Sequence, residues 1–181
     1  TRRGVEESKG LFEEFTKTQP RREFHGRRTE DVSGDYIYNS KNVHDSYLVV
    51  DGENVRYSQL LQQAGGSKEC YDQTAFGLRS EWIYDSCWVG IDVNTIKFSF
   101  WNYGAHHLEY SIGCLDSGNL FGCVGIRKGE YCILNKQYTK EEYLALVPKI
   151  KEHMNQMPYL DQQGREYTYG EFFPVELSPW M

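Results

Sequence analysis

The chain has 181 residues, of which 39% are hydrophobic and 15% aromatic, so it can bury one continuous core but is too short for two full domains. Its formal net charge of −6 is unevenly spread. Residues 1–28 hold eight of the 20 Lys and Arg and five of the 26 Asp and Glu, so the other 12 basic and 21 acidic residues leave the body near −9. This negative body argues against binding of duplex nucleic acid, which needs a positive surface.

Cysteine usage and hydropathy narrow the class of protein further. The five cysteines form no C-x-x-C pair, which favours free thiols and a reducing, cytoplasmic compartment over a disulfide framework. No apolar stretch approaches the ~20 residues of a membrane span, and no signal-peptide pattern is present. No G-x-S-x-G, P-loop or dinucleotide motif occurs, so we expect no membrane contact and no cofactor.

The first predicted element is a helix over residues 4–18. Val5, Leu11, Phe12 and Phe15 recur there at helical spacing and the pattern stops before Pro20. We assign residues 1–35 to an N-terminal helical segment and linker, and expect this segment to cover one end of the domain that follows.

Residues 36–138 contain eight degenerate repeats of 11–15 residues. Each has an apolar anchor and, three positions later, a residue that is mostly small and suits a sharp corner of the chain. One short strand and one turn use about a dozen residues, so the repeat predicts a mainly β fold, a short parallel β-solenoid or β-helix. The anchors are Val43, Val55, Cys70, Ile83, Ile96, Leu108, Leu120 and Tyr131.

The number of repeats in each coil sets the positions of the anchors. Two repeats per coil would give about four coils, with alternate anchors on opposite walls: Val43, Cys70, Ile96 and Leu120 on one, and the others on the second. The longest step, from Val55 to Cys70, predicts an outward loop at residues 62–66.

Residues 139–181 form the expected C-terminal cap and an extended aromatic tail. Thr139 and Glu142 make a capping-box signature, after which Tyr143, Leu144, Val147, Ile150 and Met154 should share one helix face. Pro148 should kink or split this helix.

The run 119–143, N-L-F-G-C-V-G-I-R-K-G-E-Y-C-I-L-N-K-Q-Y-T-K-E-E-Y, carries a family resemblance. The chain resembles an uncharacterised group of bacterial tandem-repeat proteins with S-K-N-x-x-D-S repeats, here 40–46, an F-G-C-V-G-L-R-N-K-x-Y-C-I-x-N-K-Q-Y segment and a T/S-K-E-E-Y helix. The resemblance covers residues 36–155. In that group the repeats are often rich in cysteine and linked to a zinc-ribbon-like region. The sequence given contains few such cysteines and no such region, and the resemblance implies no activity.

A binding surface is predicted at the residues one position after each anchor, which should point outward. This column mixes aromatic and charged side chains, as protein interfaces do, and the nearby Trp88 and Trp101 could stack on sugar rings. The column comprises His44, Arg56, Tyr71, Tyr84, Lys97, Glu109, Phe121 and Cys132.

Two further kinds of site are possible. Cys114 and Cys123, with His106 and His107 nearby, are weak zinc candidates, because zinc needs four converging ligands and Cys114, Cys123 and Cys132 are expected to face different ways. Cys114 with one of these histidines is also the only local pair for nucleophilic cysteine catalysis.

Three carboxylates raise the possibility of polysaccharide cleavage. Asp45, Asp72 and Asp85 each follow an anchor by two residues, with Asp45 and Asp72 expected on one wall and Asp85 on the other. An Asp recurring beside a Ser is typical of a turn cap. The leading hypothesis is therefore a non-catalytic solenoid scaffold that binds a protein partner or its own copy. The alternatives are a carbohydrate-binding or polysaccharide-processing β-helix and a zinc-binding accessory protein.

Overall fold

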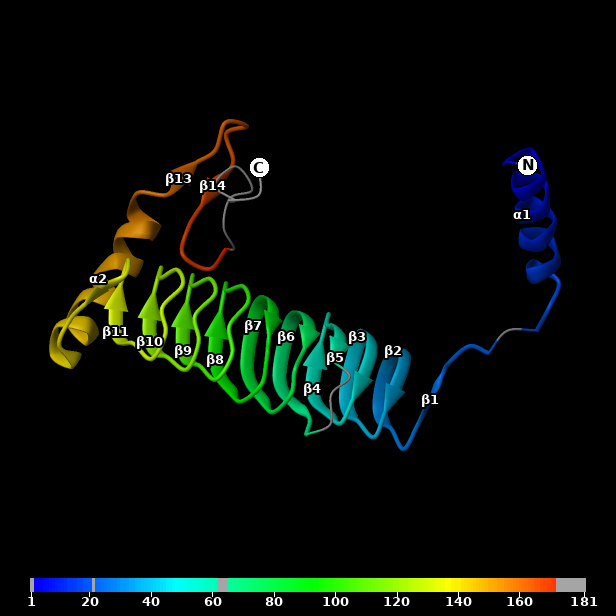
Figure 1. The fold of residues 1–181 in the computed structure, drawn as a ribbon, viewed down its shortest axis with the longest axis horizontal. Coiled ribbons are helices and arrows are strands. Elements are labelled where there is room, and N and C mark those ends of the chain that lie inside the picture. The colour runs from blue at the N-terminus through cyan, green and yellow to red at the C-terminus, as the bar shows by residue number, and fades with distance from the viewer. Residues whose placement is uncertain (1, 21, 62–64, 172–181) are drawn as a thin grey trace.

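A computed structural model describes residues 2–20, 22–61 and 65–171, and it confirms a mainly β, parallel β-solenoid (Figure 1). The helix α1 (Arg2–Lys17) precedes the solenoid, and α2 (Lys140–Gln156) follows it. The strands β2 to β11 stack in parallel along the solenoid axis. Their bounds are β2 (Glu30–Tyr38), β3 (Lys41–Val50), β4 (Gly52–Arg56), β5 (Gln59–Leu61), β6 (Ser67–Phe76), β7 (Ser80–Val89), β8 (Val93–Lys97), β9 (His106–Glu109), β10 (Gly118–Phe121) and β11 (Glu130–Ile133).

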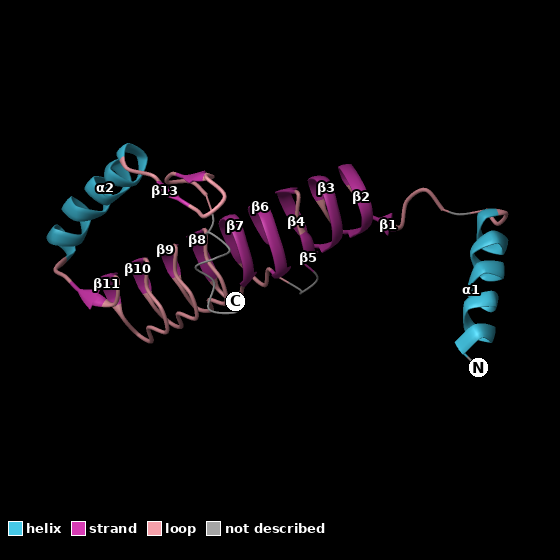
Figure 2. Ribbon diagram, turned by 90° about the horizontal axis from the view of Figure 1, so that it is seen from above, coloured by secondary structure: helices cyan, strands magenta, loops and turns pink. Residues whose placement is uncertain are grey.

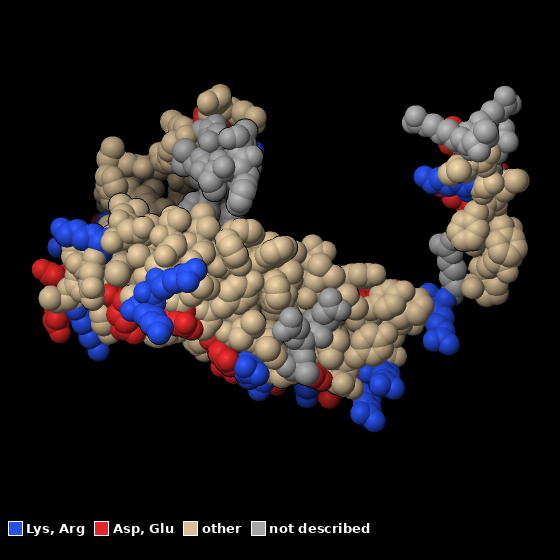
Figure 3. Space-filling view, in the orientation of Figure 1, with Lys and Arg blue, Asp and Glu red and all other residues tan. Residues whose placement is uncertain are grey.

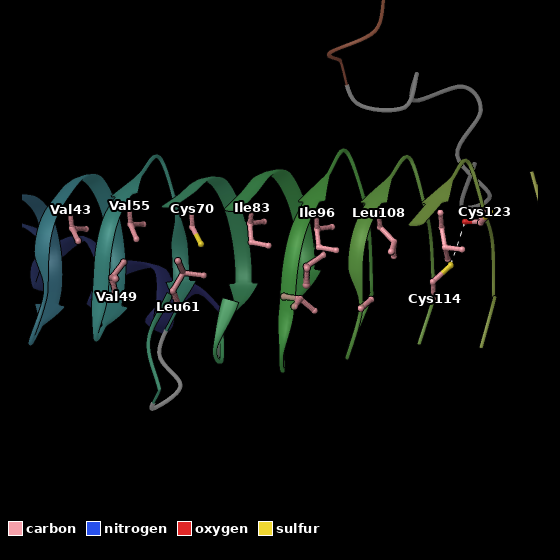
Figure 4. Close-up of a cluster of buried hydrophobic side chains, with 14 of the residues drawn as sticks. Val43, Val49, Val55, Leu61, Cys70, Ile83, Ile96, Leu108, Cys114 and Cys123 are labelled. Carbon is pink, nitrogen blue, oxygen red and sulfur yellow. Dashed lines mark hydrogen bonds between the residues drawn. The ribbon is translucent and has the colours of Figure 1, made fainter. Parts of the chain in front are cut away.

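Each repeat closes one full coil, so the expected two repeats per coil are wrong. Val43 pairs directly with Val55, Val55 with Cys70, and every later anchor with the next one along the chain. The anchors therefore form one column along one side of the core, in a solenoid of about nine coils (Figure 4). Cys132 takes the last position in place of Tyr131, because Leu120 pairs with Cys132. Val49 and Leu61 belong to a second core column.

The geometry behind these coils is a three-residue unit. Between Val43 and Val55 every third residue points inward and is buried. The residue before each inward position has a left-handed backbone, for example Asn42 at φ 51° and Asp45 at φ 49°. A left-handed residue turns the chain sharply, so four such corners close a coil of about 12 residues. The expected loop at residues 62–66 lies partly outside the described residues, and Gly65 and Gly66 are described in a turn.

Polar side chains also point into the core, where they satisfy the backbone at the corners. The Ser99 hydroxyl donates to the Lys97 carbonyl at 2.7 Å and accepts from the Ser111 amide at 3.1 Å. Ser46, Ser58, Ser86 and Ser111 repeat this pattern on neighbouring coils. The column of small residues is thus a hydrogen-bonded ladder inside the solenoid.

The N-terminal helix does not cover the solenoid as expected. α1 stands away from the first coils (Figures 1 and 2), and its apolar side chains Val5, Leu11, Phe12 and Phe15 are 58–71% exposed. Phe24 and Val32 pack against the core at this end instead, beside the short strand β1 (Gly26–Arg27).

The C-terminal cap is present. The strand β12 (Lys136–Gln137) turns back antiparallel to β11, and the Thr139–Glu142 capping box starts α2. This helix continues unbroken through Pro148 and buries Tyr143 and Val147, whereas Leu144 is 56% exposed and faces away. A short hairpin of β13 (Tyr159–Leu160) and β14 (Glu166–Tyr167) follows. The rest of the predicted aromatic tail, residues 172–181, lies outside the described residues.

Candidate interaction surface

The predicted outer column exists as a continuous ladder, which we call the anchor wall. Parallel pairing sets its members side by side on successive coils, and Arg56 and Tyr84 are exposed. Cys132 is not a member, because it points into the core and Ile133 takes the outer place. The anchor wall consists of His44, Arg56, Tyr71, Tyr84, Lys97, Glu109, Phe121 and Ile133.

The C-terminal segment covers the later half of the anchor wall. Glu109 accepts from the Lys151 ammonium at 2.6 Å and from the Tyr169 hydroxyl at 2.8 Å. Phe121 is only 6% exposed, packed in one cluster with Tyr143 and Val147 of α2. Burial, followed by the nearby Glu109, raises the pKa of Tyr169. Glu109 and Phe121 therefore contact the chain's own C-terminal segment, whereas Arg56 and Tyr84 in the earlier half of the wall are exposed.

A second surface lies on the next side of each coil, and we call it the apolar wall. The residues one position after each anchor did not point to it. From Tyr47 onward it has a central and an edge column of outward residues, and none of them carries a charge; on the preceding coil, Asp35 pairs with Tyr47. The central column is Tyr47, Gln59, Thr74, Cys87, Phe100, Ile112 and Val124. The edge column, formed by the left-handed residue that follows each of these, is Leu48, Leu60, Ala75, Trp88, Trp101, Gly113 and Gly125.

The apolar wall is large and open. Tyr47, Trp88, Trp101 and Val124 are 48–58% exposed. Figure 3 shows a broad strip of the solenoid without Lys, Arg, Asp or Glu, with charged side chains gathered along its lower edge. The sequence itself contains this pattern: from Ser46 to Cys123, the two residues that follow each inward residue of the small-residue column are uncharged. Contiguous apolar surface is uncommon on monomers, so this wall is the candidate interaction surface of the described chain.

Aromatic contacts order the middle of this wall. Trp88 stacks on Phe100 of the next coil, with ring centres 6.4 Å apart and planes 24° apart, and meets Phe76 edge-on at 6.0 Å. Trp101 is hydrogen-bonded through its side chain to Tyr103. Trp88 and Trp101 thus occupy the same column on adjacent coils, half exposed and held by their neighbours.

The opposite side of each coil is an ion-pair wall with alternating charge. Lys41 pairs with Glu30 at 3.1 Å, and Lys68 pairs with Glu53 at 3.3 Å. All four side chains are at least 48% exposed, so each pair contributes little stability. The ion-pair wall consists of Glu30, Lys41, Glu53, Lys68, Glu81, Asn94, His106, Gly118 and Glu130.

The three aspartates lie on one corner, so the placement of Asp85 on a different wall is wrong. Asp45, Asp72 and Asp85 all follow the anchor column by two residues and have left-handed backbones. Burial, and then the nearby Asp72 carboxylate, raise the pKa of Asp85. Asp72 and Asp85 lie on successive coils, and Asp45 lies two coils before Asp72 on the same outer corner. This arrangement is that of turn residues rather than of two carboxylates facing each other across a cleft.

The cysteines and histidines do not converge. Cys114, Cys123 and Cys132 all point into the core, contrary to the expectation that they face different ways, and burial raises the pKa of each thiol. His106 lies outside on the ion-pair wall, 3.8 Å from Glu130, with His107 beside it. Across the described parts of the chain, no three His, Cys, Asp or Glu side chains are grouped so that they could hold a metal ion.

We compared the chain with protein-family models, with curated proteins and with solved structures. Nothing matched. Among the described residues, no helix has the length and apolar character needed to cross a membrane.

Proposed function

We propose that the chain is a non-catalytic binding or assembly module, whose solenoid presents a rigid wall to a protein partner or to its own copy. The observation that carries this proposal is the apolar wall, a run of uncharged and largely apolar side chains over seven successive coils from Tyr47 to Val124. Interface centres are depleted in charge and enriched in aromatic residues. Stacked coils also hold the wall in place, which lowers the entropic cost of binding.

Position-specific photo-crosslinking tests this proposal. A photoreactive phenylalanine analogue replaces Phe100 on the apolar wall or, as a matched control, Asn94 on the ion-pair wall of the same coil. In the cell that makes the protein, we expect discrete crosslinked species from position 100 only, and their loss when Ile112→Lys is added. Equal crosslinking from both positions, or none from position 100, would contradict the proposal.

Carbohydrate binding is the second candidate, because Trp88 and Trp101 are half exposed on adjacent coils. Sugar recognition also needs hydrogen-bonding groups beside the aromatic platform. Cys87, Phe100 and Ile112 surround these tryptophans and offer none at the wall surface. Titration with soluble oligosaccharides, followed by tryptophan fluorescence, should leave the spectrum unchanged, and a saturable shift lost in Trp101→Ala would favour this candidate.

A further inference from the structure

The edge column of the apolar wall changes abruptly in size along the solenoid. Trp88 and Trp101 make a ridge on two successive coils, and Gly113 and Gly125 follow on the next two. A Cβ built on Gly125 would meet nothing within 4 Å, and one on Gly113 would meet only the Trp101 ring, at 4.0 Å. We call these two glycines the notch; beside it, the side chain of Val124 is 58% exposed.

Ridge and notch are related so that the wall can fit itself. Consider a two-fold axis that lies between two facing walls, perpendicular to the solenoid axis, and passes between the coils of Trp101 and Gly113. This rotation leaves the edge column facing an edge column and reverses the order of the coils. It places Trp101 of one copy over Gly113 of the other, and Trp88 over Gly125. Both contacts occur twice, as an isologous interface requires.

Charge also favours a second copy on this wall over the other walls. In a wall-to-wall dimer the unpaired charges of one copy would be buried against the other, which is costly. The ion-pair wall is charged on most coils, and the later anchor wall is already covered by α2 and Tyr169. Within the described solenoid, the central and edge columns of the apolar wall can meet those of a second copy without burying a charge.

The available area fits a weak dimer. Around the proposed axis, the four wall coils from Trp88 to Gly125 face those of the second copy, and at either end the coil of Ala75 faces the closing turn at Asn135. At ~4.8 Å per coil this overlap is about 29 Å long. With a width of four residues and their flanking side chains, the contact buries on the order of 500 Å² per copy and 1,000 Å² in total. This area is near the lower limit for a specific interface, so we expect a weak and reversible dimer.

End-to-end association competes poorly at the C-terminal end. The antiparallel strand β12 and the helix α2 close the last coil there. The Asn135 side chain further donates to the Val124 carbonyl at 2.9 Å and accepts from its amide at 2.8 Å, so this backbone edge is satisfied. A second copy therefore cannot extend the solenoid from this end.

We infer that the apolar wall is the contact face of a symmetric antiparallel dimer, with the Trp88–Trp101 ridge of each copy seated in the Gly113–Gly125 notch of the other. This inference rests on the proposed function and deepens it by naming the partner as a second copy of the chain. Two flat β walls pack about 10 Å apart, which leaves room for one layer of interdigitated indoles.

A double-substitution cycle on the full chain tests the inference, with the weight-average mass measured by sedimentation from 5 to 500 µM. Gly125→Trp sets indole against indole and should weaken the dimer at least tenfold. Trp88→Gly leaves a gap and should also weaken it. The combined variant restores one ridge and one notch at the same contact, and should bring the dissociation constant back to within about threefold of the parent. Tryptophan is tolerated at left-handed corners, as Trp82 at φ 57° shows.

Thr95→Trp adds the same side chain at a left-handed corner beside the ion-pair wall and should leave the dimer unchanged. If circular dichroism shows that one substitution at this contact impairs folding, Trp101→Gly with Gly113→Trp provides a second cycle. No rescue in the combined variant overturns the inference. So does dissociation by Phe12→Asp but not by Gly125→Trp, which would place the contact on α1. If the parent chain stays monomeric but position 100 still crosslinks to another protein, the dimer is overturned and the proposed function stands. If the parent chain stays monomeric and position 100 crosslinks to nothing, both are overturned.

Discussion

Glu109 and Lys151 are 42 residues apart in the chain and form a 2.6 Å ion pair that joins the solenoid to α2. Their side chains are only 19% and 27% exposed, so solvent screens this pair less than the pairs of the ion-pair wall. The same carboxylate accepts from Tyr169, and the Tyr110 hydroxyl accepts from the Gly170 amide at 2.9 Å. These contacts fix the C-terminal segment on the anchor wall.

Replacing this carboxylate should loosen the segment without unfolding the solenoid. Glu109→Gln removes a charge-assisted hydrogen bond, which contributes about 1.5–3 kcal/mol. We expect faster amide hydrogen exchange in residues 140–171 and unchanged exchange in β6 and β7. Lys68→Gln, which removes an exposed pair, is the control and should change exchange very little. Equal protection of α2 in both variants would show that Glu109 does not hold it.

A buried amide should be among the most sensitive positions of the core. Asn102 is fully buried; its side chain accepts from the Cys114 amide at 2.8 Å and donates to the Ser111 carbonyl at 3.0 Å. Asn102→Leu leaves the Cys114 amide buried without a partner and removes one of the two hydrogen bonds to the Ser111 carbonyl, which still accepts from the Phe100 amide. We expect a cost of about 2–4 kcal/mol. Urea unfolding should show this loss, while Asn94→Leu on the ion-pair wall should change stability by less than about 1 kcal/mol. Similar losses in the two variants would mean that Asn102 is not a structural hydrogen-bonding centre.

The stability of the chain should fall in alkaline solution partly through one thiol. Burial raises the pKa of Cys70 from 9.0 to about 12. Below pH 9 the thiol is neutral in both the folded and the unfolded chain. Above pH 9 only the unfolded chain ionises, so stability decreases with pH up to about 12 by roughly 1.4 kcal/mol per pH unit from this group. Cys70→Val should unfold with a shallower pH dependence between pH 9 and 11 under reducing conditions, and parallel curves for parent and variant would contradict the assignment.

The left-handed corners can be tested at an exposed position. Lys128 has φ 53° and an exposed side chain. Asparagine adopts this conformation at lower cost than lysine, so Lys128→Asn should stabilise the fold by about 0.5–1 kcal/mol. Valine is disfavoured there, so Lys128→Val should destabilise it. The same two substitutions at the adjacent Arg127, whose φ is not positive, should not show this order in thermal unfolding. An equal response at both positions would remove the basis for the three-residue unit.

The sequence was sufficient for the parallel solenoid, for the burial of the anchors from Val43 to Leu120 and for the capped C-terminal helix. It did not show how many repeats close a coil, because the inward residues recur every three positions, a period typical of neither helix nor strand. It also placed the last anchor at Tyr131, 11 residues after Leu120, whereas the inward residue is Cys132, 12 residues after Leu120. When the repeats are aligned with one repeat per coil, the two uncharged residues that follow each residue of the small-residue column fall on a single wall.

Other features depend on contacts between distant residues. Phe121 was expected to be exposed and is buried, because α2 and Tyr169 fold back over its wall. The apolar face of α1, in contrast, was expected to cover the first coil and does not. Such packing depends on the length and direction of the segments that join the helices to the solenoid. A pattern of residue types does not give that direction.

The most direct test of the apolar wall as an association surface is the weight-average mass of the 21.2 kDa chain as its concentration rises. The measurement compares the parent with Ile112→Lys, which places one charge at the centre of the wall. We expect the mass of the parent to rise toward twice the monomer value by several hundred micromolar, and the mass of the variant to stay at the monomer value. If the two chains follow the same curve, whether monomeric or dimeric, the apolar wall is not the surface through which the protein associates with itself.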